Sequence, residues 1–140
     1  MRRIIGIGSP FGADRLGWQA IDLLAGASLP ATELLKLDRP GSELIRYLAG
    51  VDEVVIIDAV QSGGCRPGTV LALARSDLAC LPALNSSHGF GVAEALALAE
   101  RLDALPARIR LLGIEAGMDP ALPVQPDLRG LIGGLSGAVG

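Results

Sequence analysis

Short apolar runs alternate along the chain with segments whose apolar positions recur every three or four residues. The runs are rich in Ile, Leu and Val and predict strands, whereas the three-to-four spacing predicts amphipathic helices. The predicted strands are residues 2–8, 32–38, 52–60, 69–74 and 107–116, and the predicted helices are residues 14–27, 40–50 and 89–105, with a short helix from about Leu128. Residues 75–88 and the proline-rich stretch 117–127 show neither pattern, so we expect irregular structure there.

The alternation of strands and helices indicates the fold class. The segment "DEVVIIDAV" (52–60) is a nearly continuous β-branched run, which is typical of a central strand covered on both faces. Crossovers between parallel strands are right-handed, so the helices are expected to cover both faces of one sheet. We therefore expect a three-layer α/β/α sandwich with a mostly parallel sheet of about five strands. The 140 residues suit a single domain, 1–140.

Charge and composition argue against several classes of partner. The net charge is −3 and the Lys and Arg residues are scattered, whereas a nucleic-acid surface needs a basic stripe, so we expect no nucleic-acid partner. No apolar stretch approaches the roughly 18–20 residues of a membrane span, and we expect no membrane partner. The first strand is too short for the apolar region of a signal peptide. Cys65 and Cys80 lack metal-binding spacing and are expected to be free thiols. These features together favour a cytoplasmic location.

Three residues that can bind a metal fall where strands end or helices begin. Asp14 follows the first strand through a glycine-rich turn, Asp58 lies at the end of an apolar run, and His88 immediately precedes the long helix. Such positions meet at one edge of a parallel sheet, so we expect the three side chains to lie together. Taken singly, Asp14 could cap a helix and His88 could be an ordinary loop residue, but a charge in an apolar run such as Asp58 is costly unless paired. Two carboxylates and an imidazole suit nickel or zinc.

The glycine-rich turn after the first strand has two interpretations. Gly6, Gly8 and Gly12 resemble the dinucleotide-binding fingerprint, with Asp38 after the second strand as the acid that would bind the ribose. The third glycine falls one residue late for that fingerprint, and the chain leaves little room for a substrate domain. Alternatively, the small residues let the chain wrap tightly so that Asp14 reaches a metal site, which also accounts for Asp58 and His88.

Four blocks of the sequence carry a family resemblance. "GIGSPFGADRLGWQAI", "VVIIDAVQSGGCRPGTV", "SSHGFGVAEALALAERL" and "LLGIEA" resemble, in order and over nearly the whole chain, the hydrogenase maturation endopeptidases. The resemblance implies a small α/β enzyme that removes a short C-terminal extension from the precursor of the nickel–iron hydrogenase large subunit, after nickel has been inserted. It implies that Asp14, Asp58 and His88 bind nickel supplied by that precursor, for which zinc or another divalent ion can substitute. Asp38 matches an acidic position after the second strand and is a further candidate for the catalytic site.

The first block departs from the family pattern. Ser9 stands where the family has asparagine, Ala13 replaces one of two acids, and the turn is one residue shorter. Aligning the flanking glycines matches Asp14 to the second acid, which is the metal ligand. In the other alignment Arg15 takes the ligand position. The departures motivate an alternative function, a non-catalytic paralogue that binds metal or precursor.

The resemblance leaves two mechanisms open. In one, the precursor's nickel polarises the scissile carbonyl or activates water, with a carboxylate as the base. In the other, nickel only positions the precursor, and the attacking group lies elsewhere. The sequence has no G-x-S-x-G or H-E-x-x-H motif. The resemblance implies that the catalytic candidates are Asp14, Asp58, His88 and Asp38.

Overall fold

The computed structural model describes residues 1–8, 15–38, 41–61, 64–74, 85–86, 89–117 and 124–136. Along the chain the elements are β1 (Arg2–Ile7), α1 (Arg15–Ala25), β2 (Thr32–Leu37), α2 (Gly41–Arg46), β3 (Glu53–Gln61), β4 (Val70–Leu73), β5 (Asn85–Ser86), α4 (Gly89–Arg101), β6 (Arg108–Glu115) and α5 (Leu128–Ser136).

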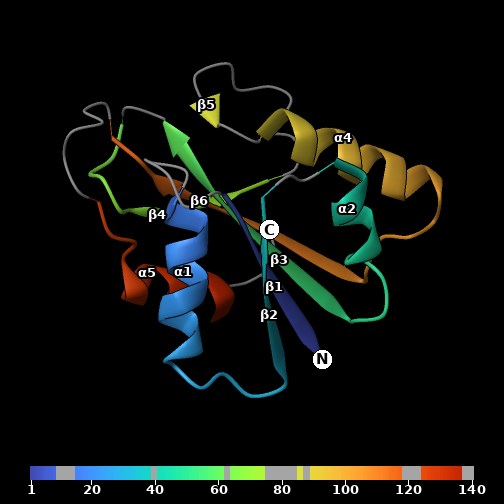
Figure 1. Ribbon diagram of the computed structural model, residues 1–140, viewed down its shortest axis with the longest axis horizontal. Coiled ribbons are helices and arrows are strands. Elements are labelled where there is room, and N and C mark those ends of the chain that lie inside the picture. The colour runs from blue at the N-terminus through green and yellow to red at the C-terminus, as the bar shows by residue number, and fades with distance from the viewer. Residues whose placement is uncertain are drawn as a thin grey trace.

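The strands form one mostly parallel sheet in the order β2-β1-β3-β6-β4, with the short β5 paired to β3. The β1–β2, β1–β3 and β3–β6 pairs are parallel, while β4 runs antiparallel to β6 and β5 antiparallel to β3. Helices α1 and α5 cover one face and helices α2 and α4 the other (Figure 1). The predicted three-layer α/β/α sandwich is confirmed.

The central strand β3 divides its side chains between the two faces, as the pleat of a strand requires. Val55, Ile57 and Ala59 pack in the cluster beneath α1 and α5, whereas Val54 and Ile56 pack in the cluster beneath α2 and α4. All five are at most 4% exposed. Each of the four Val and Ile side chains contributes about 1.5–3 kcal/mol by burial, so this strand anchors both layers.

Two glycines bring α1 unusually close to the sheet. A Cβ at Gly17 would lie 2.1 Å from the backbone oxygen of Ile7, and a Cβ at Gly6 would lie 2.4 Å from the backbone oxygen of Gly17. Only residues without a side chain allow this contact between β1 and α1. Part of the glycine pattern in the first block therefore serves helix–sheet packing.

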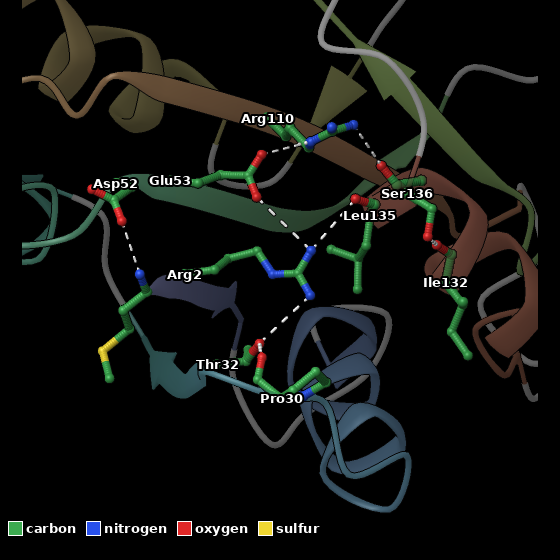
Figure 2. Close-up of polar contacts among 11 residues, drawn as sticks. Arg2, Pro30, Thr32, Asp52, Glu53, Arg110, Ile132, Leu135 and Ser136 are labelled. Carbon is green, nitrogen blue, oxygen red and sulfur yellow. Dashed lines mark hydrogen bonds and ion pairs between the residues drawn. The ribbon is translucent and has the colours of Figure 1, made fainter.

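A charged network closes the amino end of the sheet. Glu53 lies between two arginines, with Arg110 Nε 2.9 Å and Arg2 Nη1 3.8 Å from its carboxylate oxygens (Figure 2). The same guanidinium groups donate to backbone carbonyls in the last turn of α5, Arg110 to Gly134 at 3.1 Å and Arg2 to Leu135 at 3.4 Å. Cations at a helix C-terminus are favoured by the helix dipole, so the network fixes α5 as well as the strands.

The long helix ends earlier than the sequence pattern predicts. Asp103 has a positive φ of 56°, its N–H donates to Glu100 O, and the N–H of Ala104 donates to Ala99 O at 2.8 Å. These bonds form a Schellman motif that ends the helix at Arg101 instead of 105. Near this end Leu98 is 47% exposed and Leu102 is 61% exposed. The core side of α4 includes Ala95, Leu96 and Ala99.

Candidate active site at the carboxyl edge of the sheet

Asp58 is a buried acid on β3, beyond the point where β1 stops pairing with that strand. The side chain is 7% exposed, and by the alternation of β3 it lies on the face covered by α2 and α4. The β1–β3 pairing ends at Gly6 and Ile57. The backbone N–H of Ala59 lies past that end and donates to Asp58 Oδ1 at 2.8 Å. This hydrogen bond orients the Asp58 carboxylate at the edge of the sheet.

The strand β5 takes the place of β1 beside the last residues of β3. Ser86 pairs with Val60 and Asn85 pairs with Gln61 in antiparallel register. The prediction of irregular structure for 75–88 is therefore wrong at these two residues, because the exposed edge of β3 offers backbone partners that periodicity cannot reveal. The pairing brings the chain two residues before His88 next to the strand that carries Asp58.

The four predicted site residues have different outcomes. Asp14 and His88 lie outside the described residues, and their proximity to Asp58 stays a prediction. Asp38 follows β2 directly and is exposed. Because Lys36, Gly6 and Ile57 are in register across β2, β1 and β3, Asp38 and Asp58 belong to the same edge of the sheet, separated by two strand spacings of about 4.8 Å each.

The position of Arg15 bears on the alignment of the first block. Arg15, which competes with Asp14 for the ligand position, is the exposed first residue of α1. No group of three or more His, Cys, Asp and Glu side chains that could hold a metal ion occurs within the described ranges, which contain only one of the three proposed ligands.

A second buried acid at this edge, Glu115, was not singled out from the sequence. It ends β6, is 0% exposed, and its Oε2 accepts a hydrogen bond from the backbone N–H of Gly117 at 3.2 Å. Gly113 and Glu115 pair with Asp58 and Val60, so Glu115 lies diagonally across from Asp58 on the same face. The signal was present in "LLGIEA", where an acid follows apolar residues just as Asp58 does in "VVIID".

Solved structures of two hydrogenase maturation enzymes share this fold. The hydrogenase maturating endopeptidase HybD from E. coli superposes with a TM-score of 0.68 at 21% identity, over 96% of this chain and 85% of that chain. The NiFe hydrogenase maturation protease HybD from Thermococcus kodakarensis gives a TM-score of 0.65 at 24% identity, over 96% and 91% of the two chains. No curated protein sequence matches the chain at a significant level.

The protein is an α/β sandwich with a buried acid at the carboxyl edge of its sheet, which is the edge where ligands of such sheets bind. Residues 32–131 match the family model described as hydrogenase maturation protease. The chain belongs to the hydrogenase maturation protease family. This match confirms the family predicted from the sequence and its enzyme class, a protease. None of the helices within the described residues is both long and apolar enough to span a bilayer.

Proposed function

We propose that this protein is a cytoplasmic processing endopeptidase that removes the C-terminal extension of a nickel-loaded hydrogenase large-subunit precursor. The observation that carries the proposal is the position of Asp58. It is a carboxylate only 7% exposed, at the ligand-binding edge of a sheet whose family is that of the hydrogenase maturation proteases. Two of the similar structures are named as enzymes of hydrogenase maturation, which supports a hydrogenase precursor as the substrate.

We propose that nickel arrives with the precursor and is bound by Asp14, Asp58 and His88. Asp58 fits such a role, because it is a buried carboxylate at the edge of the sheet and carboxylate oxygens are ligands of divalent cations. Zinc or another divalent ion with a preference for oxygen and imidazole ligands can substitute. When bound, such an ion polarises carbonyl groups and lowers the pKa of water.

The chain's own residues then have separate tasks. Asp58 holds a fixed negative charge at the edge, which attracts the cation of the docking precursor. Asp38 is exposed at the same edge and is able to accept a proton from water near the bound peptide. His88, the single histidine, completes a mixed ligand set.

The deciding experiment is mass spectrometry of the purified nickel-loaded precursor after incubation with the protein. Wild-type protein is expected to shorten the precursor by its C-terminal peptide, and Asp58→Asn and His88→Ala are expected to abolish the cleavage. Asp52→Asn is the matched control, because Asp52 is exposed at the amino end of β3 and the same chemical change there removes no site residue. An Asp58→Asn protein that cleaves at the wild-type rate would refute the proposal.

The altered first block supports a second candidate, a non-catalytic paralogue that binds metal or precursor. Ser9 and Ala13 replace the expected asparagine and acid. Binding of the nickel-loaded precursor without any loss of mass, measured in the same assay, would favour this candidate. Retention of a dinucleotide by wild-type and Asp58→Asn protein alike would favour the nucleotide-binding interpretation instead.

A further inference from the structure

The end of β3 that carries Asp58 is held differently from the rest of that strand. Up to Ile57 the strand lies between β1 and β6, and beyond it the described partner on the β1 side is the two-residue β5. Strand ends with few partners open more readily than strand centres. The orientation of Asp58 therefore depends strongly on how the last residues of β3 are fixed to β6.

At the end of β3, the side chains of Gln61 and Glu115 bind both backbone polar groups of Gly117. Gln61, the last residue of β3, donates from Nε2 to the carbonyl oxygen of Gly117 at 3.2 Å, and the N–H of Gly117 donates to Glu115 Oε2 at 3.2 Å. Gly117 has a positive φ of 80°, and a Cβ on it would lie 2.8 Å from Pro67 Cγ. We name Gln61, Glu115 and Gly117 the edge clamp.

The edge clamp is itself anchored from the other side of β6. The backbone of Glu115 accepts from Gly68 N at 2.7 Å and donates to Thr69 O at 2.9 Å. The next residue, Ala116, donates to Val60 O at 2.8 Å. The clamp thus joins β3, β6 and the segment before β4 at a point where Glu115 lies about 8 Å from Asp58 by strand spacing and rise.

We propose that Gln61 and Glu115 are positioning residues for Asp58, an inference that rests on the proposed function. They lock the end of β3 to the end of β6, so that the Asp58 carboxylate is preorganised when the precursor docks. Glu115 acts through its acceptor oxygen, and Gln61 acts through its donor nitrogen. Displacement of a catalytic group by about 1 Å can cost about a hundredfold in rate, so small losses of order at this edge are costly.

The test compares kcat and KM for precursor cleavage among four variants, below their melting temperatures. Gln61→Ala and Glu115→Ala break the clamp and are expected to lower kcat by about ten- to a hundredfold while KM changes by less than about threefold. Glu115→Gln keeps an acceptor oxygen for Gly117 and is expected to stay within about threefold of wild type. Thr32→Ala is the matched control, because it removes one contact with Arg2 at the opposite end of the sheet.

Hydrogen exchange of residues 54–61 provides a readout that does not need the substrate. The clamp predicts faster exchange there in Gln61→Ala and Glu115→Ala, but not in Glu115→Gln or Thr32→Ala. If wild-type protein cleaves the precursor, an unchanged kcat in Gln61→Ala would overturn the inference. Equal losses of kcat in Glu115→Gln and Glu115→Ala would overturn it as well. If wild-type protein does not cleave the precursor, the proposed function fails, and the hydrogen-exchange rates alone test the edge clamp. Exchange at the wild-type rate in Gln61→Ala would then refute the edge clamp.

Discussion

The two ends of β3 each contain an acid, and the protein treats the two acids in different ways. At the amino end Glu53 lies between Arg2 and Arg110, with its side chain 13% exposed. At the carboxyl end Asp58 accepts a hydrogen bond from the backbone N–H of Ala59, and Glu115 on the next strand accepts one from Gly117. An arginine neutralises the charge that it contacts, whereas a backbone N–H stabilises a carboxylate without adding a positive charge.

Under the proposed function, the difference separates charge that stabilises the fold from charge that takes part in binding. The amino end joins three strands and the last turn of α5 through guanidinium groups (Figure 2). The carboxyl end presents acids at the edge where α/β sheets bind ligands. A substitution at one end should therefore change unfolding, and a substitution at the other end should change cleavage.

The largest expected effect belongs to Asp58→Asn. The amide is nearly isosteric with the carboxylate and keeps an acceptor for the N–H of Ala59, so the melting temperature should not fall. Cleavage of the nickel-loaded precursor should fall by about a thousandfold or more, because the charge that meets the cation is lost. Mass-spectrometric cleavage rates and thermal unfolding of the same preparations measure both quantities. Loss of stability in parallel with activity would break the proposed division between the two ends.

Glu53→Ala is the reciprocal change. Removal of the Glu53 carboxylate leaves Arg2 and Arg110 facing each other in a partly buried site. We expect a loss of about 3 kcal/mol in the free energy of unfolding. The cleavage rate of the folded protein should stay within about twofold of wild type, since the change lies far from the carboxyl edge. Urea denaturation and cleavage kinetics at low temperature test this pair of outcomes. A large fall in kcat with little loss of stability would contradict it.

Arg110→Lys should have a smaller effect at the same end. Lysine keeps the positive charge but cannot donate in a fixed geometry to both Glu53 and the carbonyl of Gly134. We expect a loss of about 1–2 kcal/mol in the free energy of unfolding, measured by urea denaturation. A lysine variant as stable as wild type would show that charge alone, without guanidinium geometry, holds α5.

The smallest expected effect belongs to Asp52→Asn. The N-terminal ammonium group donates to the exposed Asp52 carboxylate at 2.9 Å and holds the pKa of Asp52 below its ordinary value of 3.8. A lowered pKa in the folded state stabilises the protein above pH 3.8, and this contribution is lost as the pH falls through the lowered value. The melting temperatures of wild type and variant should differ slightly near pH 6 and converge at the lowest pH. A difference that grows on acidification would contradict this assignment.

Long regular patterns made most of the fold predictable. The β-branched run before Asp58 correctly indicated a central strand, because a strand buried on both faces must be apolar at nearly every position. The three-to-four spacing of α1 indicated a helix, and its buried positions include Leu16, Ala20 and Leu24. The two-residue β5 was not predictable, since its pairing depends on where β1 leaves β3 and not on any periodicity of its own.

The candidate site was predictable only in part. The sequence indicated Asp58 because an acid within an apolar run is costly unless it has a role. The same argument applies to Glu115, but its hydrogen bond to Gly117 depends on a turn with positive φ that the sequence does not specify. Asp14 and His88 lie outside the described residues, so their part in the site stays a prediction.

The contact between Gly17 and the backbone of Ile7 has a consequence for how this family can diversify. It fixes the start of α1 against the end of β1, so both anchors of the intervening connection are set by backbone packing. A change in the number of residues between Ile7 and Arg15 then need not shift the helix. Under the proposed function, such a change is a way to exchange the side chain that meets the cation, while the hydrophobic core stays as it is.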